Sequence, residues 1–120
     1  METLSPEKSG APGLHVVSGD SNFFVVLLKV IETAGAFPEA HGIWDLGNIS
    51  FSEINSVAIN NFIHGLPALP RRTICPKIAF VAPSDVGYGI MRMFEMRADG
   101  KLPFQMMVFR TMKEAEEWAR

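Results

Sequence analysis

KIAFVAPSDVGYGIMRMFEMR, residues 77–97, is the stretch that decides the fold class. Residues 77–83 are apolar at nearly every position, which is typical of a strand covered on both faces. Ser84 or Asp85 then caps a helix that we expect to run to about Ala98, because a side-chain oxygen can accept the free amides of the first helical turn. A buried strand that leads directly into a helix is the repeating unit of α/β proteins.

The same unit repeats on both sides of this stretch. We expect further strands at 14–19, 42–46 and 106–109, and further helices at 20–34, at 50–64 and from Thr111 to the C-terminus. Asp20 is the predicted N-cap of the first of these helices, and Ser50 with Glu53 forms a capping box for the second. The sequence therefore predicts a small, mostly parallel sheet with about four helices packed on it. An antiparallel position at the sheet edge stays open for the first strand.

Composition points to one folded domain. The chain has 120 residues, of which 48% are hydrophobic and 20% charged, so it can bury a core without disulfides or metals. We expect a polar tail over 1–13 and a single domain over 14–120. Cys75 is the only cysteine, which excludes an intramolecular disulfide. Residues 1–13 lack the pattern of a signal peptide and no apolar run is long enough to span a bilayer, so we expect a cytoplasmic protein without a transmembrane segment.

Motifs for common enzymatic chemistry are absent from the sequence. It contains no P-loop, no dinucleotide-binding glycine motif and no nucleophile elbow. His15, His41 and His64 lie far apart, and no pair has the spacing of a metal site on one helix. The net charge of -2 gives no electrostatic reason to expect a nucleic acid partner. The sequence therefore predicts a non-enzymatic protein with no cofactor and no metal.

Candidate binding residues gather where the predicted strands end. Ligands of open α/β sheets bind beyond the carboxyl ends of the strands, and here that edge carries Asp45, Ser50, Ser84 and Asp85. The amides at the starts of the following helices favour negative groups there. An alternative interpretation of Asp45 is that its carboxylate only fixes the strand-to-helix turn.

A second candidate surface begins at Gly87, Tyr88 and Gly89. Two glycines in the first turns of a helix lower its stability, so either close packing or the close approach of a ligand should compensate. Six of the seven methionines lie between Met91 and Met112. We expect these methionines to form one wall of the domain, either as core or as an apolar pocket that includes Met91.

Three segments together resemble the SpoIIAA-like proteins of the STAS superfamily: IWDLGNISFSE at 43–53, KIAFVAPSDVGYGIMRMFEM at 77–96 and VFRTMKEAEEWA at 108–119. The resemblance covers about residues 14–119. It implies a small α/β domain with a mixed sheet of four or five strands and helices mainly on one side of it. It also implies a binding or switching module rather than an enzyme.

The resemblance also bears on phosphorylation. Some STAS proteins carry a phosphorylated serine at the start of the helix that follows their second core strand. Aligning that strand end with Asp45 and Leu46 places Ile54 or Asn55 at the position of the serine. We therefore expect no phosphorylation there, although Ser50, Ser52 and Ser56 remain possible acceptors.

From these features we expect a regulatory module that binds another protein or itself. The alternative is a carrier or sensor of a small apolar, lipid-like molecule, which the resemblance also suggests, together with membrane association.

Overall fold

The computed structural model describes residues 13–17, 22–37, 40–66 and 76–119. The strands are β1 (Gly13–Val16), β2 (Gly42–Asp45), β3 (Lys77–Val81) and β4 (Gln105–Phe109), and the helices are α1 (Phe23–Ala36), α2 (Ser56–His64), α3 (Asp85–Arg97) and α4 (Met112–Ala119). The predicted α/β fold with four helices is confirmed. The predicted tail lies outside the described residues, apart from Gly13, which begins β1.

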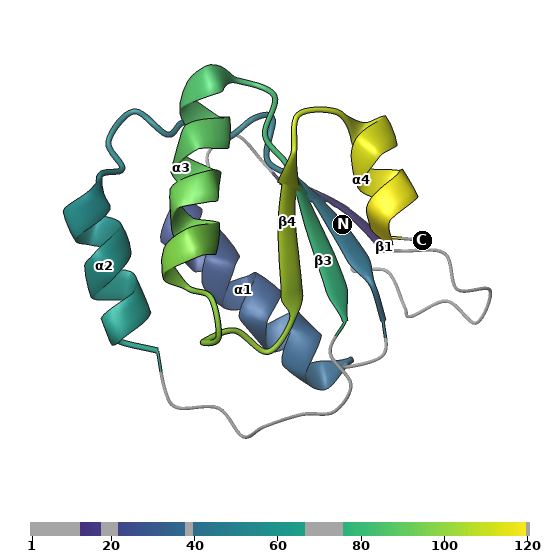
Figure 1. Ribbon diagram of the computed structural model, residues 1–120, viewed down its shortest axis with the longest axis horizontal. Coiled ribbons are helices and arrows are strands. Elements are labelled where there is room, and N and C mark those ends of the chain that lie inside the picture. Colours follow the sequence, from purple (N-terminus) through teal and green to yellow (C-terminus); the bar gives the residue numbers. More distant parts are fainter. Residues whose placement is uncertain (1–12, 18–21, 38–39, 67–75, 120) are drawn as a thin grey trace.

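The four described strands form one sheet in the order β1-β2-β3-β4, and every neighbouring pair is parallel. β1 is therefore a parallel edge strand, not an antiparallel one. Right-handed crossovers between strands that are added in one direction place all their helices on the same face. Figure 1 shows this arrangement, with α1, α2 and α3 on one side of the sheet and α4 on the other.

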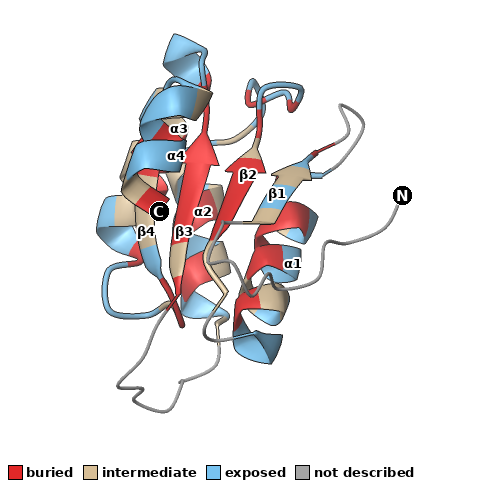
Figure 2. Ribbon diagram, turned by 90° about the vertical axis from the view of Figure 1, so that its right-hand side faces the viewer, coloured by how far each residue is buried: buried red, intermediate tan, exposed pale blue. Residues whose placement is uncertain are grey.

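Two apolar clusters hold the layers together. The larger one joins Trp44, Ile78, Phe80 and Val108 of the sheet to α1, α2 and α3. The smaller one joins the opposite face to α4, and consists of Ile43, Ala79, Val81, Ala115 and Ala119. In Figure 2, β2 and β3 are mostly buried, whereas β1 is only partly buried. The apolar run of β3 thus reflects coverage on both faces, as its sequence predicts.

The boundaries of α1 and α3 correct one expectation and confirm another. α1 begins at Phe23 with Asn22 as its N-cap, whose side chain accepts the amides of Phe24 at 2.9 Å and Val25 at 3.2 Å. Asp20, the predicted cap, lies outside the described residues. α3 begins at Asp85 after the N-cap Ser84, one of the two predicted caps, and ends at Arg97, one residue before the predicted end.

α2 begins six residues later than predicted, so the Ser50–Glu53 capping box is wrong. Its N-cap is Asn55, whose side chain accepts the amide of Ala58 at 2.9 Å. Ile49 and Phe51 are both buried. Residues two apart point to the same side of an extended chain but not of a helix, so burial of both favours an extended segment here.

Candidate functional site

Asp45 lies at the carboxyl end of β2 and is used by the turn that follows. Its Oδ1 atom accepts the amide of Gly47 at 2.9 Å. A Cβ atom on Gly47 would lie 3.1 Å from that same oxygen and 3.7 Å from Pro83, so the turn packs beside the loop after β3. The structure therefore supports the alternative interpretation, in which this carboxylate fixes the strand-to-helix turn.

Ser50 does not lie at a helix N-terminus. Its hydroxyl lies 3.2 Å from the hydroxyl of Ser52 in the loop before α2. Both serines line a hollow of about 370 Å³ beside the start of α1, together with Asn22, Phe23, Phe24, Glu53 and Ile54. A phosphate on Ser50 or Ser52 would consequently not lie in the first turn of α2, where the sequence suggested it would be stabilised. Asn55, at the expected STAS position, is occupied in capping α2.

Ser84, Asp85, Gly87 and Tyr88 are brought together in the first turn of α3. The Ser84 hydroxyl accepts the amide of Gly87 at 3.0 Å, which caps the helix. The Asp85 carboxylate pairs with Arg110 at 2.7 Å, and the Arg110 guanidinium lies 4.5 Å from the centre of the Tyr88 ring. The Ser84 hydroxyl, the Asp85 carboxylate and the face of the Tyr88 ring thus have partners within the domain.

Arg110 is the member of this group that the sequence analysis missed. It follows β4 directly, and the carboxyl ends of parallel neighbouring strands meet at one edge of a sheet. The residue after β4 therefore faces the loop after β3, where Asp85 begins α3. That placement becomes predictable once the β3–β4 pairing is known.

Gly87 and Gly89 differ in what surrounds them. A Cβ atom on Gly87 would lie 2.8 Å from Cε2 of Phe51 and 2.9 Å from the Ser84 hydroxyl, whereas one on Gly89 would have nothing within 4 Å. Close packing therefore explains Gly87, although its neighbour is the loop before α2 rather than the sheet. No contact in the structure explains Gly89.

The order of the described strands does not favour a ligand site at the carboxyl edge of the sheet. Crevices in open α/β sheets form where the strand order reverses, because neighbouring loops then lead to opposite faces. The four described strands follow one another without reversal. The carboxyl edge consequently has no switch point among the described strands.

The methionines do not form one wall. Met91 is fully buried in the larger cluster, against which Met93 and Met106 pack, whereas Met112 packs against the smaller cluster on the opposite face of the sheet. Met96 is 66% exposed. Successive residues of a strand point to opposite faces, so the side chains of Met106 and Met107 of β4 lie on opposite faces of the sheet.

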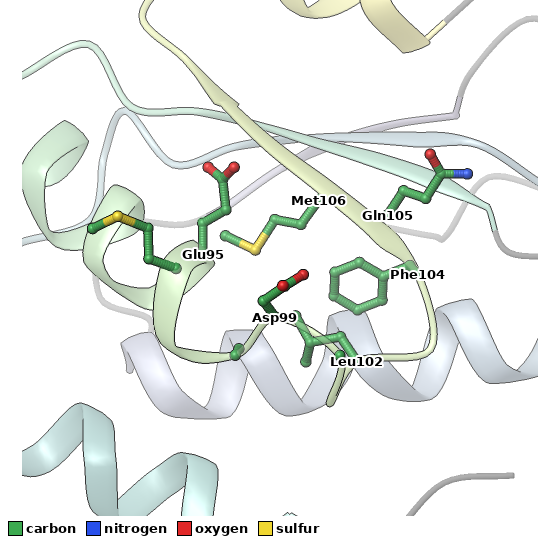
Figure 3. Close-up of a pocket in the computed structure, with 9 residues that line it drawn as sticks. Glu95, Asp99, Leu102, Phe104, Gln105 and Met106 are labelled. Carbon is green, nitrogen blue, oxygen red and sulfur yellow. The ribbon is translucent and has the colours of Figure 1, made fainter. Parts of the chain in front are cut away.

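Met96 and Met106 line an open cavity of about 550 Å³ where α3 ends and β4 begins. We call it the Met96 cavity; its other lining residues are Glu95, Ala98, Asp99, Gly100, Leu102, Phe104 and Gln105. Figure 3 shows the labelled side chains around this space, with the carboxylates of Glu95 and Asp99 among apolar groups. Gly100 has a φ of 81°, a left-handed conformation that favours glycine and shapes the loop below α3. The cavity lies at the end of α3 opposite the predicted site.

The histidines are held apart. His15 stacks on Trp44 with ring centres 4.1 Å apart, and burial lowers its pKa. His41 accepts the amide of Lys77 through Nδ1 at 2.8 Å; burial and, secondarily, the Lys77 charge lower its pKa. Among the described residues, no group of three metal-ligating side chains comes together.

No helix in the described segments has the length and apolar character needed to cross a membrane. Comparison with family models, curated proteins and solved structures finds no match to this chain. The resemblance to SpoIIAA-like proteins therefore stays a prediction.

Proposed function

We propose that this protein is a non-enzymatic binding module, and that the Met96 cavity receives a segment of another protein. The observation that carries the proposal is the exposure of Met96, 66% of which is accessible to solvent. Met96 lines this hollow together with the partly exposed Leu102 and Met106, and an exposed apolar surface made of several side chains is typical of contact sites. The resemblance to STAS binding and switching modules supports the same function.

The chemistry of the lining also favours a protein partner. Methionine is unbranched and polarisable, so it adapts to partners of different shape. Met96 and Met106 contribute such side chains from a helix and a strand, while Phe104 is buried beneath. A lining with a fixed aromatic base and adjustable methionines suits an inserted side chain of a partner.

Carriage of a small apolar molecule is the second candidate. The cavity volume of about 550 Å³ lies in the range of small-molecule sites. A carrier would retain its ligand through mild purification. Native mass spectrometry of the intact protein would then show a defined added mass, which a protein-binding module would lack.

Site-specific photo-crosslinking in cells tests the protein partner. A benzophenone amino acid replaces Met96 in one variant and Val57 in a matched control, because Val57 is a similarly exposed apolar residue, 64% accessible, on α2. We expect one defined cross-linked protein from position 96 and not from position 57. The same diffuse products from both positions, or none from position 96, would contradict the proposal. Cross-links between two copies of this chain would show that the cavity binds a second copy and not a different protein.

A further inference from the structure

The Met96 cavity combines an apolar surface with negative charge. Met96, Leu102, Phe104 and Met106 supply the apolar part. Glu95 and Asp99 add carboxylates on the α3 side, and Figure 3 shows them around the same space. A purely apolar ligand that covered the Asp99 carboxylate would remove it from water without a compensating partner, which is unfavourable.

The negative charge of Asp99 lies where it lowers the stability of the isolated domain. It lies two residues beyond Arg97, the last residue of α3, and a carboxylate is repelled by the negative end of a helix dipole. The last carbonyl groups of a helix, which have no partner within it, add to this negative field. Both effects make the cavity attractive to a cation.

The bases near Asp99 are engaged elsewhere or lie outside the cavity lining. Arg92 pairs with Glu95 at 3.0 Å. Arg97 donates to the side chain of Asn60 at 2.9 Å and so points toward α2. Lys101 is exposed and is not among the lining residues. Within the described part of the chain, Asp99 itself makes no ion pair and no side-chain hydrogen bond.

We propose that the Met96 cavity binds a lysine or arginine side chain that is flanked by an apolar residue in a partner protein. This inference rests on the proposed function and names the chemistry of the partner. Long basic side chains lay their methylene stems along apolar surface and keep the charge at the tip. The stem packs against Met96 and Met106, and the charged head reaches Asp99 and the terminal carbonyls of α3.

Fluorescence anisotropy with three labelled pentapeptides tests the inference. Each alternates leucine with a second residue, which is arginine, asparagine or glutamate. We expect the arginine peptide to bind about tenfold more tightly than the asparagine peptide, which corresponds to roughly 1.4 kcal/mol. The glutamate peptide should bind least. Equal affinity for the arginine and asparagine peptides, or no binding of the arginine peptide, would overturn the inference.

Variants that change one carboxylate test whether the preference for the arginine peptide arises in the cavity. Asp99→Asn should weaken binding of the arginine peptide about three- to fivefold, the upper part of the range for an exposed ion pair, and leave the asparagine peptide unchanged. Asp99→Glu should retain most of the preference. Glu116→Gln is the matched control, because Glu116 is an exposed carboxylate on α4, across the sheet. Equal weakening by both neutral variants would place the charge effect outside the cavity and overturn the inference.

A competition experiment distinguishes a site for small free amines from a site for a protein side chain. Hexylammonium should compete with the arginine peptide only weakly, because it lacks the flanking apolar residues. Competition as strong as that of the unlabelled peptide would assign the site to small amines instead. Failure in these binding assays, with a defined cross-link from position 96, would reject the basic partner and leave the proposed function in place.

Discussion

The two ends of α3 differ in how their side chains are used. At the first turn, Ser84 caps the helix, Asp85 pairs with Arg110 and Gly87 packs against Phe51. At the last turn, Met96 is exposed and Asp99 is an acidic residue beyond a negative helix end. Asp85 lies at the positive end of the helix dipole, where a carboxylate is stabilising, whereas Asp99 lies beyond the negative end and departs from that rule. Departures of this kind concentrate at functional sites, so we place binding at the last turn.

Gly87→Ala should have the largest effect on stability. The added methyl group would lie 2.8 Å from Phe51 and 2.9 Å from the Ser84 hydroxyl, and overpacking of this kind costs about 1–3 kcal/mol. Urea unfolding followed by circular dichroism measures the free energy of unfolding. An unchanged value would show that the first turn is loosely packed, and would remove the contrast between the two ends.

Gly89→Ala should have the opposite sign and a smaller size. A methyl group at this position meets nothing within 4 Å, and alanine is favoured over glycine inside a helix by about 1 kcal/mol. The same urea experiment should therefore show a rise in the free energy of unfolding. A fall would contradict the open space that the structure shows around Gly89.

Acid should weaken the amino end of the sheet, where His41 accepts the amide of Lys77. The pKa of His41 is lowered below its ordinary value of 6.5 in the folded protein, so folding favours the neutral ring. The stabilisation is present above pH 6.5 and is lost as the pH falls through the folded pKa.

Urea unfolding between pH 7.5 and pH 5.5 measures this loss. His15, whose pKa is also lowered by burial, contributes with the same sign. His41→Gln should therefore reduce the pH dependence and leave the part that belongs to His15. A free energy of unfolding that rises toward pH 5.5 would contradict both pKa directions.

Asp99→Asn should change stability least. Removal of a charge from the wrong end of a helix dipole is expected to raise the free energy of unfolding by about 0.3 kcal/mol. Thermal unfolding of the variant at low and high salt detects this, because salt screens the repulsion and should reduce the difference. A destabilised variant would mean that Asp99 supports the fold, and would weaken the argument for binding at the last turn.

The sequence predicts most of the fold because its signals are local. The apolar run of β3 and the Ser84 cap lie within one strand–helix unit, and both are confirmed. The start of α2 is not predictable from the capping box at Ser50, because the loop before it is held by contacts with distant elements. Ile49 and Phe51 are buried, and the centre of the Phe51 ring lies 5.4 Å from that of Phe23.

The candidate site depends on contacts that sequence spacing does not contain. Tyr88 and Asp85 are identified by the glycine-rich turn, but their partner Arg110 follows a different strand. The methionine count points toward the right region, yet the separation of Met106 from Met112 follows from strand alternation and from the return of α4 across the sheet. In the sequence, the Met96 cavity is marked locally by Asp99 and Gly100, which follow α3 directly but do not reveal that β4 lies beside them.

Methionine-methyl NMR tests the central claim most directly, because the reporters lie in both clusters and in the Met96 cavity. Protein labelled with carbon-13 in its methionine methyl groups is titrated with the pentapeptide that alternates leucine and arginine. We predict shifts of the Met96 and Met106 signals, which line the cavity, and no shift of Met91 in the core or Met112 on the opposite face. Unmoved Met96 and Met106 signals, or an equal shift of Met112, would contradict binding at the last turn of α3.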